Sequence, residues 1–84
     1  MAYDVVYPKR VDKELDALPR GGGALLRADF ERFAADPLAP DIDIVKLKAM
    51  ESVFRVRCGS YRLTFRREDK TLTALRATDR KDAY

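Results

Sequence analysis

The chain has 84 residues, of which 46% are hydrophobic and 37% are charged, and its formal net charge is +3. This length and composition fit one small globular domain over residues 1–84 and exclude a disordered chain. No apolar run approaches the roughly 20 residues that cross a bilayer, so we expect no membrane association. The N-terminal letters M-A-Y-D-V-V-Y lack signal-peptide features and a single cysteine forms no internal disulfide, so we expect a cytoplasmic protein.

The N-terminal half alternates between extended and helical patterns. Residues 2–7 are rich in β-branched and aromatic side chains and predict a strand that ends at Pro8. Apolar residues at positions i, i+4 and i+7 predict a short helix over 9–18, and a similar stripe predicts a second helix over 24–36. The glycines at 21–23 predict a flexible turn between the two helices.

The C-terminal half reads as a set of strands. Residues 37–43 predict a loop, and residues 45–50 fit either a short strand or an extended lead-in segment. Strands over 53–58, 61–67 and 71–77 predict an antiparallel meander. The predicted order is β-α-α-β-β-β, an α+β fold with the helices on one face of the sheet and a basic face on the other.

The basic face is expected because the first two strands of the meander alternate with period two. In V-F-R-V-R-C-G-S-Y-R-L-T-F the arginines and Thr64 point one way, and the opposite set is Phe54, Val56, Cys58, Tyr61, Leu63 and Phe65. The outward set contains four arginines, namely Arg55, Arg57, Arg62 and Arg66. Residues 44–84 also carry eleven Lys/Arg against five Asp/Glu, whereas residues 1–43 carry six against nine. Such asymmetry indicates a polyanion partner, although a solvated basic face without a ligand fits it equally well.

The missing residue types exclude several kinds of chemistry. The chain has no histidine and one cysteine, which excludes a zinc site, and it has no clustered carboxylates for magnesium. No phosphate-cradling or dinucleotide-binding glycine motif is present, so we expect neither a metal nor a cofactor. Arginine forks can still clamp a phosphate, and RNA supplies its own nucleophile in the 2′-hydroxyl group. Such a face could cleave RNA without a metal, or could simply bind it.

Several motifs together resemble one known family. The segments D-K-E-L-D-A-L-P, K-L-K-A-M, F-R-V-R-C-G-S-Y-R-L-T-F and R-K-D-A-Y are similar, in this order, to the RelE/ParE superfamily of bacterial toxins. The resemblance implies a toxin that a cognate antitoxin holds inactive in a hetero-oligomeric complex. RelE-type members are ribosome-dependent endoribonucleases that cut mRNA by 2′-hydroxyl attack. ParE-type members share the fold but inhibit DNA gyrase.

The resemblance also assigns residues by position. The basic pair of RelE falls on Arg55 and Arg57, the next-strand arginine on Arg62, the C-terminal arginine on Arg80 and the terminal tyrosine on Tyr84. We expect Arg57, Arg62, Arg80 and Tyr84 to be catalytic. The arginines would clamp the phosphate or stand near the leaving oxygen, and Tyr84 would stack on a base or move a proton.

Other basic residues are expected to bind RNA without taking part in the chemistry. They are Lys46, Lys48, Arg55 and Arg66. Lysines on a solvated strand edge give the same pattern without RNA. Because arginine cannot act as a general base where RelE has lysine, Glu51 is a weak candidate for that role.

Three functions therefore compete at the level of sequence. The first is a RelE-like mRNA interferase, and the retention of Arg62, Arg80 and Tyr84 favours it. The second is a ParE-like gyrase inhibitor, or another member of the superfamily that acts by binding a protein without cleaving RNA. The replacement of lysines by arginines favours this second function. The third is an RNA-binding module outside the superfamily.

Overall fold

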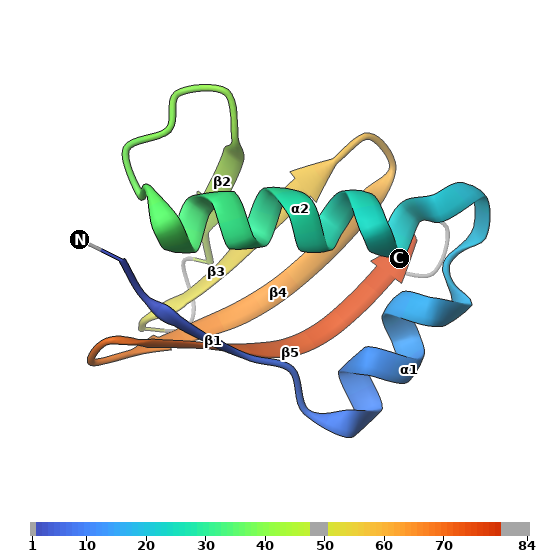
Figure 1. Ribbon diagram of the computed structural model, residues 1–84, viewed down its shortest axis with the longest axis horizontal. Coiled ribbons are helices and arrows are strands. Elements are labelled where there is room, and N and C mark those ends of the chain that lie inside the picture. The colour runs from blue at the N-terminus through green and yellow to red at the C-terminus, as the bar shows by residue number, and fades with distance from the viewer. Residues whose placement is uncertain (1, 48–50, 80–84) are drawn as a thin grey trace.

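The computed structural model describes residues 2–47 and 51–79. It contains two helices and a five-stranded sheet with the strand order β1-β5-β4-β3-β2 (Figure 1). The elements are β1 (Asp4–Val6), α1 (Lys9–Ala17), the 3₁₀ turn η1 (Pro19–Gly21), α2 (Gly22–Ala35), β2 (Asp43–Lys46), β3 (Val53–Cys58), β4 (Tyr61–Glu68) and β5 (Thr71–Asp79). The α+β class predicted from the sequence is confirmed.

The sheet differs from the prediction in two respects. The antiparallel meander of β3, β4 and β5 is present as expected, but the ambiguous segment before it contributes a further strand, β2, which pairs antiparallel with β3. β1 pairs with β5 in parallel, through Asp4–Thr71 to Val6–Thr73, so the sheet is mixed rather than antiparallel. A parallel neighbour requires a crossover connection, and the two helices belong to that connection.

The helices cover one face of the sheet. α2 crosses β3 and β4 while α1 lies along β5 (Figure 1). The core between these layers includes Leu26 and Phe30 of α2 and Leu63 and Phe65 of β4, all without exposed surface. The rings of Phe30 and Phe65 pack with their centroids 4.9 Å apart. Alternation along β3 and β4 therefore sends the apolar set toward the helices, as predicted.

The glycines between the helices are not a flexible turn, and that prediction is wrong. Gly22 and Gly23 are buried in the first turn of α2, and a Cβ atom on Gly23 would stand 2.1 Å from the carbonyl oxygen of Leu15. The glycine run therefore lets α2 approach α1 more closely than any side chain would allow. The chain reverses just before, where Arg20 and Gly21 adopt left-handed backbone angles with φ of 57° and 72°.

Side chains of α1 form hydrogen bonds with the part of the β5 edge that does not pair with β1. Arg10 donates from NH2 to the carbonyl oxygen of Leu75 at 2.6 Å, and Oε1 of Glu14 accepts from the backbone N–H of Ala77 at 2.8 Å. The pairing of β1 ends opposite Thr73, so the rest of this edge has no neighbouring strand. The two contacts with α1 satisfy part of that edge. Neither helix in the described part of the chain is long and apolar enough to cross a membrane.

Candidate nucleic-acid interface

The face of the sheet opposite the helices, called the open face below, carries arginines from three adjacent strands. Residues paired directly across strands point to the same side, so the pairing register defines rows. One row, called the first row, runs Asp43–Arg57–Arg62–Thr78 across β2, β3, β4 and β5. The next row runs Val45–Arg55–Thr64–Arg76, and Arg66 lies one step further along β4. The register thus brings Arg55, Arg57, Arg62 and Arg66 to one face and adds Arg76.

Arg57 forms a two-point ion pair with Asp43. Its Nε donates to Oδ2 at 3.0 Å and its NH2 donates to Oδ1 at 3.1 Å. Both side chains remain about half exposed, at 44% and 52% of their full surface. The pair fixes the plane of the guanidinium group and leaves its NH1 side free of protein hydrogen bonds within the described residues.

Arg62 is held at the start of β4 by backbone oxygens. Its NH1 donates to the carbonyl oxygens of Gly59 and Tyr61 at 2.9 and 3.0 Å. Gly59 makes this arrangement possible because it turns the β3–β4 hairpin with a φ of 61°. No carboxylate of the described residues forms an ion pair with Arg62, so its positive charge is not compensated there.

Arg55 has a polar atom that the fold does not satisfy. Its Nε is the one buried side-chain nitrogen or oxygen in the described part of the chain that has no hydrogen-bond partner. A buried donor left unpaired costs about 1–3 kcal/mol, which makes it a candidate for pairing with a ligand. Arg66 and Arg76 are exposed and form no ion pair within residues 2–47 and 51–79.

The remaining candidates do not join this group. Lys46 pairs with Phe54, which points toward the helices, so Lys46 leaves the sheet on the side opposite the arginines. Lys48, Arg80 and Tyr84, predicted as RNA-binding or catalytic, lie outside the described residues. Glu51 lies beyond the far end of β3, six residues from Arg57, and is not part of the first row.

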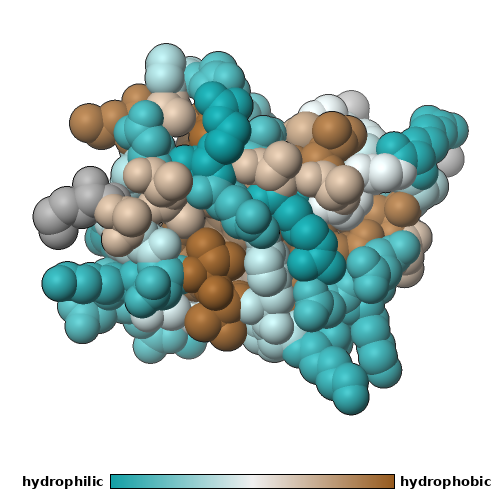
Figure 2. Space-filling model, viewed as in Figure 1, coloured by the Kyte–Doolittle hydropathy of each residue, from teal (hydrophilic) through white to brown (hydrophobic). Residues whose placement is uncertain are grey.

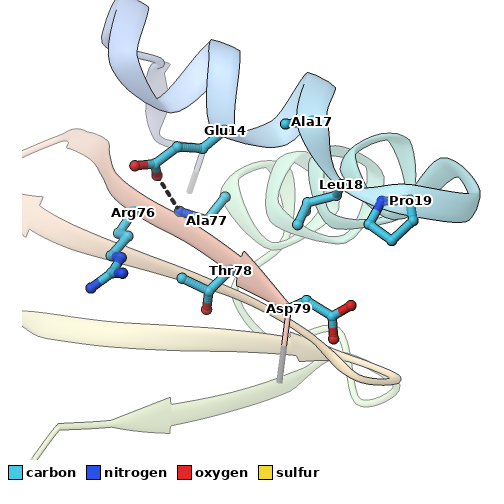
Figure 3. Close-up of a pocket in the computed structure, with 8 residues that line it drawn as sticks. All are labelled: Glu14, Ala17, Leu18, Pro19, Arg76, Ala77, Thr78 and Asp79. Atoms are coloured by element: carbon cyan, nitrogen blue, oxygen red, sulfur yellow. Dashed lines mark hydrogen bonds between the residues drawn. The ribbon is translucent and has the colours of Figure 1, made fainter. Parts of the chain in front are cut away.

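A hollow of about 570 Å³ lies on a different part of the molecule, at the edge of β5 (Figure 3). The end of α1 forms one wall, and the last residues of β5 form the other. Figure 3 shows the hydrogen bond from Ala77 to Glu14 spanning these walls, with Asp79 at the strand end. No pattern in the sequence indicates this hollow, because it depends on how far α1 stands from the strand.

The helix side offers mostly polar surface. Figure 2 views the molecule from this side and shows hydrophilic residues around smaller hydrophobic areas. The exposed large hydrophobic residues of the described chain are Val6, Leu25 and Leu38, which lie in three different segments. Within the same residues, no group of three potential metal-binding side chains comes together. The charged rows of the open face are therefore the strongest candidate site.

Solved structures resemble this chain, whereas comparisons of its sequence with known families and proteins find no match. No protein-family model and no curated protein matches the chain. Among solved structures, the chain is similar to the RelB–RelE antitoxin–toxin complex from Methanococcus jannaschii, with 23% identity, 94% of both chains covered and a TM-score of 0.78. The archaeal RelE–RelB complex from Pyrococcus horikoshii OT3 matches with 26% identity, coverage of 99% and 100%, and a TM-score of 0.73.

A third similar structure is a mutant of the E. coli toxin RelE in the free state. It shares 20% identity over 99% of this chain and 88% of that chain, with a TM-score of 0.78. The likeness extends over nearly the whole described fold in all three cases. It confirms that the chain has the RelE-like fold that the sequence motifs predicted.

Proposed function

We propose that this chain, which has the fold of the RelE toxins, is the toxin of a toxin–antitoxin system and cleaves mRNA on the ribosome. The single observation that carries the proposal is the first row, where Arg57 and Arg62 stand side by side on the open face. Two guanidinium groups on adjacent strands can bind the non-bridging oxygens of one phosphate and stabilise the charge that develops during cleavage.

The side-chain contacts suit this role. Arg62 is fixed by two backbone oxygens and has no carboxylate partner among the described residues, so a phosphate does not have to displace one. Arg55 in the neighbouring row has no hydrogen bond at Nε to break when its side chain turns toward a ligand. Arg66 and Arg76 extend the positive surface along the path of a nucleic-acid backbone.

The residue types of the open face account for the proposed dependence on the ribosome. Arginine stays protonated and cannot remove the proton of the 2′-hydroxyl group. The chain therefore stabilises charge well but has few groups that transfer protons, and much of its acceleration must come from alignment of the RNA. We expect ribosome-bound mRNA to be cut much faster than free RNA.

The partner that restrains the chain is proposed to be a cognate antitoxin. Two of the similar structures are complexes of a RelE toxin with a RelB antitoxin. Because five arginines gather on the open face, an antitoxin with an acidic or amphipathic segment would complement it. The proposed cleavage of mRNA on the ribosome implies a cytoplasmic protein, because ribosomes are found there.

The proposal is tested by replacing Arg62 and a control arginine on the same strand. Arg67 pairs with Leu72, so it lies on the opposite side of β4 and its guanidinium group stacks over Phe54 at 5.6 Å. Arg62→Ala is expected to abolish growth arrest on induction, while Arg67→Ala retains it. Both variants should unfold at the wild-type temperature, which shows that the fold is intact. Both should also still bind the antitoxin, because Arg62→Ala leaves the other four arginines of the open face in place.

The chemical readout is the mapping of mRNA ends after brief induction of the wild-type chain. Cuts in the ribosomal A site with 2′,3′-cyclic phosphate ends are expected. Full toxicity of Arg62→Ala would contradict the assignment of the open face. Intact mRNA together with relaxed or broken DNA would replace the proposal with gyrase inhibition.

A further inference from the structure

The proposed cleavage lacks a proton acceptor among the residues that the sequence singled out on the open face. The 2′-hydroxyl group must lose its proton as it attacks phosphorus, and protonated guanidinium groups have no lone pair to offer. The chain contains no histidine. The acceptor must therefore be another side chain or the ribosome.

Among the described residues, the open face carries few carboxylates, and only one stands near the paired arginines. Asp4 and Glu68 share a row with Thr71, at the opposite end of β4 from Arg62. Asp43 is in the first row itself, next to Arg57. It comes from the edge strand β2, whose outer side has no neighbouring strand in the described sheet.

The geometry of the Asp43–Arg57 pair allows both groups to meet the same nucleotide. Arg57 uses Nε and NH2 to hold the carboxylate, so its NH1 group can still donate to a phosphate oxygen. An arginine that binds a carboxylate on one side and a phosphate on another sets the two anions next to each other. The 2′-hydroxyl group lies beside the scissile phosphate, and Asp43 is half exposed toward solvent.

We infer that Asp43 is the general base of the cleavage reaction and that Arg57 presents it to the 2′-hydroxyl group. This inference rests on the proposed ribonuclease function. In the step, a carboxylate oxygen of Asp43 takes the 2′-hydroxyl proton while the 2′-oxygen forms a bond to phosphorus. The bond from phosphorus to the 5′-oxygen breaks, and the 5′-oxygen leaves with the electron pair and takes a proton from water. The products are a 2′,3′-cyclic phosphate and a 5′-hydroxyl end.

The test uses the full chain with ribosome-bound mRNA under single-turnover conditions. Asp43→Asn is close to isosteric and keeps one acceptor for Arg57, but its amide cannot take the proton. We expect its cleavage rate to fall by about 10²–10⁴-fold. Binding to mRNA that carries a 2′-deoxy nucleotide at the cleavage position should stay within about threefold of wild type, because a base acts in the chemical step and not in binding.

Two controls separate this role from a merely structural one. Glu68→Gln removes a carboxylate from the far end of the same face and should leave the cleavage rate within about twofold. A substrate with sulfur in place of the leaving 5′-oxygen needs no proton on its leaving group. The Asp43→Asn variant should remain slow on it, because the missing base still limits attack.

Each outcome decides the inference. Wild-type cleavage rates for Asp43→Asn would overturn it, as would full recovery on the sulfur substrate, which would assign Asp43 to the leaving group. A loss of binding equal to the loss of rate would show that Asp43 only orients Arg57. If wild-type protein does not cleave mRNA, the proposed function itself fails. If Arg62→Ala is inactive while Asp43→Asn is fully active, only the role of Asp43 fails.

Discussion

The helix-covered face and the open face are built from alternate residues of the same two strands, yet they obey different constraints. Leu63 and Val56 have no exposed surface and pack against the helices, whereas Arg57, one residue beyond Val56, keeps 44% of its side chain exposed. The first face is fixed by close packing, which tolerates little change in volume. The second is fixed by a few polar contacts and can change its charges without loss of the fold. Substitutions on neighbouring residues test this contrast.

The largest expected difference is between Phe65 and Arg66, which are adjacent on β4. Phe65 is fully buried among Phe30, Phe33 and Phe54, so Phe65→Ala should lower the free energy of unfolding by about 3–5 kcal/mol. Arg66→Ala should change it by less than about 0.5 kcal/mol. Urea denaturation of both variants measures the two changes in the free energy of unfolding. Equal losses would show that the open face carries core packing as well.

A second comparison sets two glycines against each other. Gly23→Ala would push a Cβ atom into the Leu15 carbonyl, and the helices must separate, so we expect a loss of at least about 2 kcal/mol. Gly59 has open space around it but a φ of 61°, so Gly59→Ala should cost only about 1 kcal/mol. Thermal unfolding of the two variants gives the ranking. A milder effect at Gly23 would mean that α1 can shift without cost.

A smaller effect is expected where a single hydrogen bond joins the sheet to η1. The hydroxyl group of Tyr61 donates to the carbonyl oxygen of Pro19 at 2.7 Å. Tyr61→Phe removes it and should lower the free energy of unfolding by about 1 kcal/mol. Tyr3→Phe is the control, because the Tyr3 hydroxyl forms no hydrogen bond within the described residues, and it should change stability by less than about 0.5 kcal/mol.

The smallest effect concerns the thiol group of Cys58 on the helix-covered face. Burial raises the pKa of Cys58 above its ordinary value of 9.0, and the nearby Asp29 raises it further. The folded state therefore keeps the thiol proton to higher pH than the unfolded state does. Its contribution to stability is complete below pH 9.0 and declines as the pH rises above it.

Thiol alkylation measures this directly. Because the thiolate is the reactive form, Cys58 should react more slowly than free cysteine at pH 8–9 in the native protein and at the ordinary rate in urea. The stability difference between wild type and Cys58→Ala should shrink above pH 9.0. A native thiol that reacts as fast as free cysteine would place Cys58 in an open environment.

Local periodicity explains why the meander could be predicted from sequence. Along β3 and β4 successive side chains alternate between the two faces of the sheet. The alternation alone therefore predicts that the arginines point outward and that Phe54 and Leu63 point toward the helices. The parallel pairing of β1 with β5 was not evident, since it joins residues nearly 70 positions apart. No local pattern records a contact at that separation.

Asp43 was missed for the same reason. It precedes Arg57 by 14 positions, at the end of the segment for which the sequence predicts a loop, so no local pattern connects it with the arginines. The cue available was the run I-V-K after it, which is β-branched enough for a strand. The prediction of a flexible turn at the glycine run is wrong for another reason. Glycine permits both a flexible turn and a close approach between helices, so the residue type alone does not distinguish them.

The contacts of Arg10 and Glu14 with the outer margin of β5 have a consequence for how this chain behaves in a crowded cell. A bare strand margin recruits other polypeptides into intermolecular sheets and, eventually, fibrils. By occupying one carbonyl and one amide of that margin, the first helix leaves fewer backbone groups on this side of the sheet that could pair with another chain. Protection of this strand margin is thus a tertiary property, because it depends on the first helix staying packed against the sheet.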